Sequence, residues 1–274
     1  MMSTMAVRLQ QLVKWGAGAT DVVRRRNGLV FLIYHRVGGH TSVSVDLPRP
    51  LFAAQMELLA EAFRPVSMDE ATQLLQAGAP TTGRPPICVT FDDGTADFAD
   101  EVLPVLVQHA IPATLYLATH FVEAGASFPD DGLPLSWSAV SDALDTGLVT
   151  VGSHTHTHRV LKRVDAATAA DELDRSVALV QDRLGVACRD FAYPKALLGS
   201  PAAQAEVRRR FRTAVVARCR PNGYGSADLH RLNRSPVQVS DGMRWFRRKA
   251  AGGLALESDL RDVLNRRRYA GADH

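Results

Sequence analysis

Residues 87–94 of this 274-residue chain have the sequence Ile-Cys-Val-Thr-Phe-Asp-Asp-Gly. The first five residues are apolar or β-branched and predict a buried β-strand. Asp92 and Asp93 then stand at its carboxyl end, where α/β folds place their ligands. Because adjacent side chains diverge there, one carboxylate can bind a cation while the other accepts a proton. Gly94 allows the backbone to turn sharply directly after them.

A second segment, residues 153–158, has the sequence Ser-His-Thr-His-Thr-His and follows another predicted strand at 149–152. His154 and His158 are four residues apart, so on a helical turn they would share one face. His156 would point elsewhere, and we expect it at the surface or behind the ligands. Two imidazoles and one carboxylate leave positions open for water and substrate, which favours a catalytic divalent metal site.

Each motif also has a simpler interpretation. Asp-Asp-Gly after a strand is commonly a turn, and a histidine-rich pentapeptide is commonly a solvated loop. Both motifs occur in this chain, each directly after a predicted strand. Their combination favours a metal-assisted hydrolase.

Predicted strands and helices alternate along the chain. Strands are expected at residues 29–34, 87–91, 114–117, 149–152, 189–193 and 213–216, with helices between them such as 51–62 and 166–184. This alternation is typical of a parallel barrel. A chain of 274 residues with 46% hydrophobic content can form one large barrel domain.

The chain divides into three predicted parts: a helical segment at 1–27, a barrel domain at 28–250, and a short helix with a tail at 251–274. The first part has helix-like apolar spacing but no continuous apolar stretch of the kind found in signal peptides. No segment has the length and apolar content of a membrane span. The sequence therefore predicts a cytoplasmic protein, with peripheral membrane contact left open.

Charge and cysteine content narrow the class of protein. The net charge is +3, and the arginine clusters are mixed with acids, which favours solvated helix faces over a nucleic-acid-binding surface. Cys88, Cys188 and Cys219 lack the spacing of a metal knuckle, so we expect buried thiols in a reducing compartment. That location favours a substrate that is made inside the cell.

These motifs resemble those of the polysaccharide deacetylases of carbohydrate esterase family 4, which includes the nodulation-factor and chitin deacetylases. The resemblance rests on residues 90–94, 152–158 and 189–194, the last with the sequence Arg-Asp-Phe-Ala-Tyr-Pro. Weaker landmarks occur in the family's order at residues 34–37, 103–104, 111–114 and 136–137. The resemblance implies the family's irregular (β/α)7 barrel, with every proposed site residue on one rim.

The resemblance also implies a role for each site residue. Asp93, His154 and His158 are expected to bind one divalent cation, with Zn²⁺ as the first candidate and Co²⁺, Ni²⁺ and Mn²⁺ as alternatives. Asp92 is expected to be the general base, since zinc lowers the pKa of bound water to about 7. Arg189 is expected to orient Asp92 and hold it ionised. The alternative for Arg189 is an ordinary surface side chain.

The chain departs from the family after Pro194, where Lys195 and Ala196 stand in place of the usual aromatic residue and glycine. The backbone N–H of Lys195 can still be the expected oxyanion donor. Its side chain is new and can change what the site accepts. Replacement of glycine by Ala196 puts a positive-φ turn there in doubt.

Two histidines are candidates for the general acid. Many family members take it from a late Leu-x-His motif, which this chain lacks near its C-terminal end. His35 follows Tyr34 at the end of the first predicted strand and resembles the arrangement in deacetylases of exported poly-N-acetylglucosamine. A histidine with an ordinary pKa near 6.5 can protonate a departing amine at neutral pH. His230 is the second candidate, and a core or loop position is the alternative for His35.

The sequence therefore predicts a metal-dependent hydrolase that removes an acetyl group from the nitrogen of an amino sugar or glycoconjugate. The same groups could attack an ester, which gives an O-acetyl carbohydrate esterase as one alternative. The departures at residues 195–196 and in the late motif leave a second alternative, a catalytically silent carbohydrate-binding relative. The intact Asp92 and the complete metal triad argue against that relative.

Overall fold

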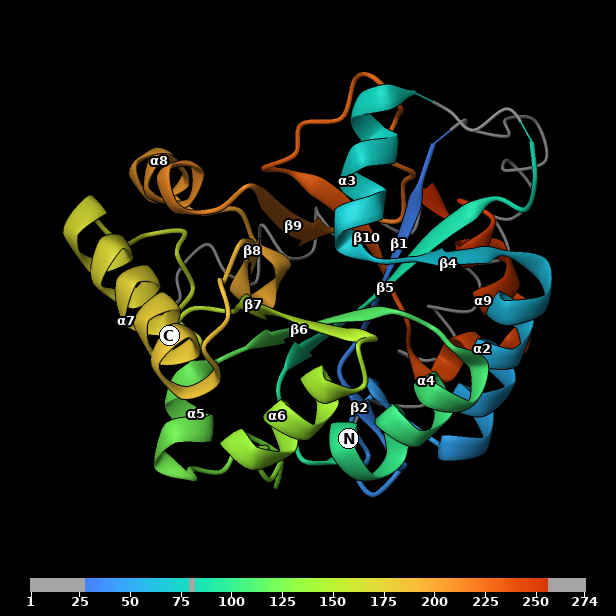
Figure 1. The fold of residues 1–274 in the computed structure, drawn as a ribbon, viewed down its shortest axis with the longest axis horizontal. Helices are drawn as coiled ribbons and strands as arrows, with labels where there is room; N and C mark the ends of the chain where they lie inside the picture. Colours follow the sequence, from blue (N-terminus) through green and yellow to red (C-terminus); the bar gives the residue numbers. More distant parts are fainter. Residues whose placement is uncertain (1–27, 79–81, 256–274) are drawn as a thin grey trace, which may run out of the picture.

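The computed structural model describes residues 28–78 and 82–255. The predicted helical segment at 1–27 and most of the predicted C-terminal part lie outside the described residues, so the domain boundaries stay predictions. Within the described chain, seven strands close into a barrel, and helices surround it (Figure 1).

The strands of the barrel are all parallel to their neighbours. Their spatial order is β1 (Val30–Tyr34), β10 (Leu232–Pro236), β9 (Thr213–Ala217), β8 (Asp190–Ala192), β7 (Val149–Ser153), β6 (Ala113–Leu117) and β5 (Pro86–Asp93). Pairing of β5 with β1 closes the barrel. A short extra strand, β4 (Arg64–Val66), pairs with the start of β5. The predicted irregular (β/α)7 barrel is therefore confirmed.

Most of the helices cover the outside of the barrel (Figure 1). The helix α3 instead packs against strand residues that face the interior of the barrel. In chain order the helices are α2 (Arg49–Ala62), α3 (Met68–Ala77), α4 (Leu103–His109), α5 (Thr119–Ala124), α6 (Trp137–Asp145), α7 (Ala166–Leu184), α8 (Pro201–Arg210) and α9 (Gly242–Ala250). Shorter elements are the paired β2 (Arg36–Val37) and β3 (Asp46–Leu47), a π-helical turn η2 (Phe98–Val102), and the 3₁₀ turns η3 (Pro194–Ala196) and η4 (Val239–Asp241). No helix of the described residues is long and apolar enough to cross a membrane.

Local sequence sets the ends of α7, whose bounds are those predicted. The Asp165 side chain accepts a hydrogen bond from the backbone N–H of Thr168 and so caps the first turn. Gly185 ends the helix in the left-handed conformation, with φ of 68°. These two signals set the length of α7, which packs beside β7.

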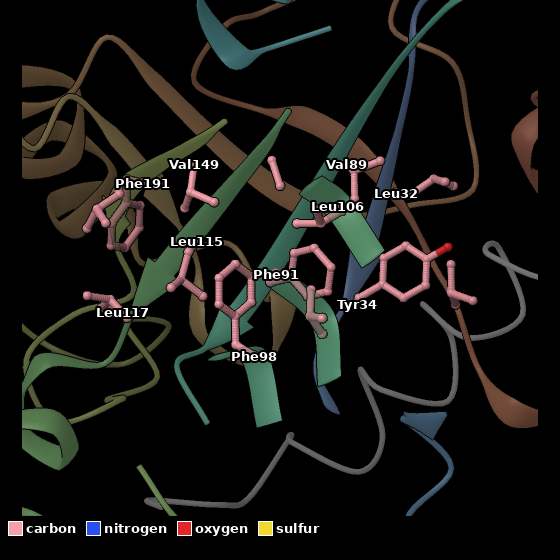
Figure 2. Close-up of a cluster of buried hydrophobic side chains, with 14 of the residues drawn as sticks. Leu32, Tyr34, Val89, Phe91, Phe98, Leu106, Leu115, Leu117, Val149 and Phe191 are labelled. Atoms are coloured by element: carbon pink, nitrogen blue, oxygen red, sulfur yellow. The ribbon is translucent and has the colours of Figure 1, made fainter. Parts of the chain in front are cut away.

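β5 carries apolar residues on both faces because both faces are buried. Ile87, Val89 and Phe91 belong to a large cluster between the barrel and the helices. Figure 2 shows part of this cluster, with Val89 and Phe91 labelled. Cys88 belongs instead to a second cluster with Phe31 and Tyr116. Since side chains alternate along a strand, Thr90 and Asp92 face the interior of the barrel. A carboxylate is thereby directed into a largely apolar space.

β10 is not predicted by the sequence pattern, because its residues Leu-Asn-Arg-Ser-Pro are mostly polar. It lies between β1 and β9 and pairs with both. Arg234, at the centre of the strand, is fully buried. The strand therefore brings a cation into the interior that holds Asp92.

Cys88, Cys188 and Cys219 are buried thiols, as predicted. Burial raises the pKa of the Cys88 and Cys188 thiols above its ordinary value. Both groups are therefore protonated at neutral pH and poorly reactive.

Candidate active site

The carboxyl ends of the barrel strands border a cavity of about 290 Å³. Six of the seven site residues predicted from the sequence line it: His35, Asp92, Asp93, His154, His158 and Lys195. These residues come from four separate regions of the chain. Their convergence follows from the parallel barrel, which gathers the carboxyl ends of its strands on one rim.

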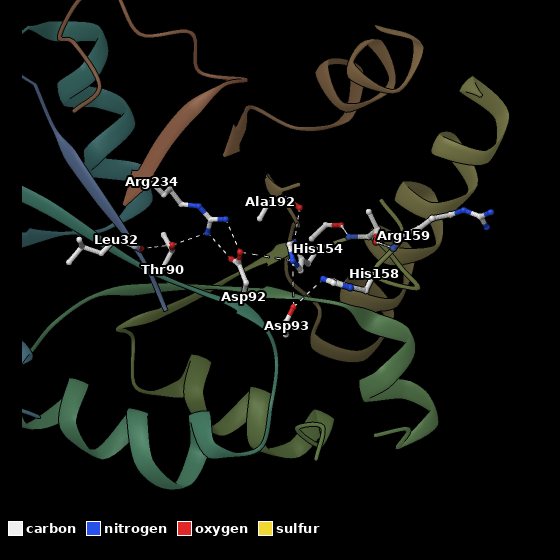
Figure 3. A network of polar contacts seen from close by, with 11 residues as sticks. Leu32, Thr90, Asp92, Asp93, His154, His158, Arg159, Ala192 and Arg234 are labelled. Carbon is white, nitrogen blue, oxygen red and sulfur yellow. Dashed lines mark hydrogen bonds and ion pairs between the residues drawn. The ribbon is translucent and has the colours of Figure 1, made fainter. Parts of the chain in front are cut away.

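Asp93, His154 and His158 form a candidate metal centre (Figure 3). One ligand atom from each residue lies within 4.8 Å of the other two. Oδ1 of Asp93 is 3.3 Å from Nε2 of His158 and 3.6 Å from Nε2 of His154. This Oδ1 is buried and has no hydrogen-bond donor among the described residues. A buried acceptor that faces two imidazole nitrogens fits a bound cation.

The electrostatics of the triad keep its groups in the forms that bind metals. Burial lowers the pKa of His154, and it lowers that of His158 to about 4 against the opposing charge of Asp93. Burial would raise the pKa of Asp93, but the nearby imidazoles, led by that of His158, lower it to about 2. Nδ1 of His154 donates to the backbone oxygen of Ala192 at 2.8 Å, so its Nε2 lone pair faces Asp93.

The two histidines lie on a loop, and the predicted helical turn is wrong. Thr155 and His158 have left-handed backbone conformations, with φ of 64° and 60°. Glu172 of α7 accepts hydrogen bonds from the backbone N–H groups of His156 and Thr157 and from the Thr157 hydroxyl, at 2.7–3.1 Å. The buried carboxylate therefore fixes the loop from behind and brings the two imidazoles together.

His156 lies behind the triad and is buried, so the second of its two predicted positions is the observed one. Its Nδ1 is 3.0 Å from the Thr119 hydroxyl, and its ring contacts that of His120 edge-on. Burial lowers its pKa. The residue packs the loop against α5 and does not line the cavity.

Asp92 is paired with Arg234 (Figure 3). The guanidinium donates to both carboxylate oxygens, at 2.6 and 2.7 Å, and also to the Thr90 hydroxyl at 2.9 Å. Arg234 is 0% and Asp92 3% exposed. Burial alone would raise the pKa of Asp92, but the charge and hydrogen bonds of Arg234, together with His154, hold it below its ordinary value. Asp92 is therefore an oriented, ionised carboxylate.

Arg189 does not contact Asp92, so the predicted contact is wrong. Its side chain is exposed, and it directly precedes β8. Because β8 is parallel to the other strands, its first residues lie at the rim opposite the cavity. Arg234 holds Asp92 instead, from a strand that the sequence pattern does not indicate.

The two candidate general acids lie at opposite ends of the barrel. His35 follows β1 and lines the cavity, and its Nδ1 is buried without a hydrogen-bond partner among the described residues. Its charge contributes to the lowered pKa values of Asp92 and Asp93. His230 precedes β10, and its Nε2 lies 2.8 Å from the backbone oxygen of Phe211. Of the two, only His35 lies near the triad.

Lys195 and Ala196 form a left-handed turn at the edge of the cavity. Their φ values are 54° and 57°, so the turn that Ala196 puts in doubt is present without glycine. A left-handed conformation costs a non-glycine residue about 1–2 kcal/mol. Such strain is commonly found at functional sites.

The chain is similar to known deacetylases. The sequence profile described as polysaccharide deacetylase matches residues 79–212. The structure of IcaB from Ammonifex degensii is 26% identical with a TM-score of 0.71, and the match covers 82% of this chain and 98% of that one. No curated protein sequence matches the chain.

Two further solved structures share the fold at lower identity. The deacetylase PplD of Streptococcus pyogenes, in complex with acetate, is 19% identical with a TM-score of 0.72, and the match covers 81% of this chain and 98% of that one. The BpsB deacetylase domain of Bordetella bronchiseptica is 21% identical with a TM-score of 0.61, covering 76% and 95%. The profile match includes Asp92 and the triad, whereas His35 and Arg234 lie outside its span.

Proposed function

Because the chain belongs to the polysaccharide deacetylase family, we propose that it is a metal-dependent N-deacetylase of an acetylated amino sugar or glycoconjugate. One observation carries the proposal. Three residues that could bind a cation, Asp93, His154 and His158, line the same cavity as Asp92, whose carboxylate is paired with Arg234. Cation binding and proton transfer, the two tasks of a metal-assisted hydrolase, thus fall to different residues.

Asp93, His154 and His158 would hold the cation. A carboxylate with two neutral imidazoles suits Zn²⁺, and also Co²⁺, Ni²⁺ and Mn²⁺. When bound, the cation would lower the pKa of water and polarise the acetyl carbonyl group. With three protein ligands, the site would stay open to water and to the substrate.

Asp92 acts as the general base. Its Oδ2 is 4.0 Å from Nε2 of His154, so the carboxylate borders the space around the triad. Arg234 engages both carboxylate oxygens, but each oxygen retains a second lone pair that can accept a proton from water. The ion pair also fixes the direction in which the proton moves.

His35 acts as the general acid. Attack of water on the acetyl carbon gives a tetrahedral intermediate, and the carbon–nitrogen bond breaks readily only when the nitrogen is protonated. His35 supplies that proton, and the products are acetate and a free amine. The backbone N–H of Lys195, in the strained turn, donates to the developing oxyanion.

Mass spectrometry on a panel of acetylated glycans tests the proposal. The zinc-loaded protein is incubated with matched N-acetylated and O-acetylated sugars, with Asp92→Asn protein as the control. Release of acetate with a new free amine is the expected result. Release from O-acetylated sugars alone would make the protein an esterase, and no release from any sugar would leave a carbohydrate-binding relative.

A further inference from the structure

The ammonium group of Lys195 has no role in the proposed mechanism, which uses only the backbone N–H of this residue. The side chain is exposed at the edge of the cavity. Within residues 28–78 and 82–255, no side chain or carbonyl pairs with it. Its charge nevertheless acts on the triad, because it contributes to the lowered pKa values of Asp93 and His158.

The strained turn gives the side chain its position. Lys195 has φ of 54° and follows Pro194, whose ring restricts the backbone before it. The turn also contains hydrogen bonds from the N–H of Ala196 to Tyr193 and from the N–H of Leu197 to Pro194. Lys195 is therefore held at the rim of the cavity by its backbone, while its ammonium group keeps its freedom to meet a ligand.

The carboxylates of the cavity are already largely engaged. Asp92 is neutralised by Arg234, and a divalent cation on the triad would more than neutralise Asp93. The remaining carboxylate among the lining residues belongs to Asp130, which is exposed to solvent. Lys195 therefore has no buried carboxylate to balance once the triad is loaded.

A second cation, Arg36, lines the same cavity. Its guanidinium donates to the backbone oxygens of Pro129 and Asp130. These partners are neutral carbonyl groups, whereas the neighbouring pocket that Arg36 also lines contains five acidic residues, so Lys195 is the cation of the cavity without a nearby acidic group of this kind. With the cation bound, the cavity would carry an excess of positive charge, which attracts anionic ligands.

We propose that Lys195 recognises an anionic oxygen group, phosphate or carboxylate, on the substrate, so that the preferred substrate is an acidic N-acetylated amino sugar. This inference rests on the proposed deacetylase function. A lysine suits the role because its compact ammonium can meet either group without a fixed bidentate geometry. At an exposed site, one such ion pair gives a preference of up to about fivefold.

The test compares a neutral sugar with acidic ones. The substrates are methyl N-acetylglucosaminide, N-acetylglucosamine 6-phosphate and N-acetylglucosaminuronic acid. The measured quantity is the ratio of kcat/KM for each acidic sugar to that for the neutral one. The wild type is expected to favour an acidic sugar by up to about fivefold, with a smaller ratio at high salt. Preference for the phosphate alone or the carboxylate alone identifies the group that is recognised.

Variants of Lys195 assign the preference to its side chain. Lys195→Met should bring the ratio near one, Lys195→Glu should invert it, and Lys195→Arg should retain most of it. Lys162→Met is the matched control, since Lys162 does not line the cavity, and it should keep the wild-type ratio. A ratio that stays at the wild-type value in both Lys195→Met and Lys195→Glu overturns the inference.

A binding measurement separates this inference from the deacetylase proposal. Calorimetry gives dissociation constants for the same sugars on zinc-loaded Asp92→Asn protein, with and without Lys195→Met. Both proteins contain zinc, which attracts the anionic group equally in each. A difference between their dissociation constants is therefore due to Lys195. A Lys195-dependent preference without acetate release in the active protein refutes the deacetylase and supports the recognition. Equal binding of acidic and neutral sugars refutes the recognition, even where acetate is released.

Discussion

Asp92 and Asp93 are adjacent in the chain but belong to different regions of the molecule. Asp92 faces the barrel interior, is 3% exposed, and has both oxygens bonded to Arg234. Asp93 lies at the open rim with its side chain 21% exposed, and its Oδ1 faces two imidazoles but has no hydrogen-bond donor in the part of the chain that the structure describes. Both oxygens of the first carboxylate are thus bonded to a cationic side chain, whereas the second carboxylate has an oxygen free to bind a ligand.

Backbone conformation produces this difference. Asp92 keeps the alternation of β5, but Asp93 has φ of 79° and Gly94 has φ of 95°. A β-carbon at Gly94 would lie 2.6 Å from the Leu117 side chain, so glycine is needed for close packing as well as for φ. Two left-handed residues at a strand end thus direct neighbouring carboxylates into different surroundings.

The largest expected effect separates the two carboxylates directly. Asp92→Asn should reduce turnover at least about 100-fold, because it removes a positioned base, while the protein keeps its metal. His158→Ala should lose both turnover and metal. Metal analysis by mass spectrometry together with kcat/KM checks this. Loss of metal from Asp92→Asn, or full occupancy in His158→Ala, would contradict the division of roles.

The next effect concerns the proton donor. His35→Ala should reduce amide hydrolysis about 100-fold but should affect an activated aryl acetate far less, because a phenolate departs without a proton. His230→Ala is the control and should leave the ratio of the two activities unchanged, since it lies at the far rim. Equal losses on both substrates for His35→Ala would assign that residue a packing role.

The Arg234 pair can be tested through the pH profile. Arg234→Met removes the charge that opposes the effect of burial, so the pKa of Asp92 should rise. Since the base must be ionised, the acidic limb of kcat/KM should move to higher pH, by about 1–3 for loss of one adjacent charge. Arg189→Met is the matched control. An unmoved limb in a folded, metal-loaded Arg234→Met protein would refute the coupling.

The smallest expected effect comes from Glu172, which holds the histidine loop behind the triad. Glu172→Gln should weaken zinc binding about tenfold, because the loop loses a charged acceptor that holds two backbone N–H groups. Competition with a chelator measures this affinity. Asp171→Asn, an exposed neighbour on α7, should bind zinc like the wild type. The same affinity in Glu172→Gln and Asp171→Asn would show that the loop holds its shape without Glu172.

The sequence supports much of the barrel and most of the candidate site, for a physical reason. Buried parallel strands have continuous apolar runs, and the residues directly after them must meet on one rim, so β5 and β7 locate both motifs. Arg234 gives no such signal. β10 is mostly polar, and its burial comes from pairing with β1 and β9 rather than from its own residues. The conformation of the histidine loop could not be predicted either, because the loop is bonded to Glu172, sixteen residues from His156.

The link between Asp92 and Arg234 also sets an order of assembly. The two residues are 142 positions apart, and Arg234 bonds Thr90, which in turn bonds the backbone oxygen of Leu32. Closing a loop of this length costs more entropy than closing a short one, and topologies rich in such contacts fold slowly. A growing chain that has not reached β10 already contains the triad but lacks the partner of its base. The proposed hydrolytic activity would therefore require docking of β10, which is the last strand among the described residues and which completes the barrel.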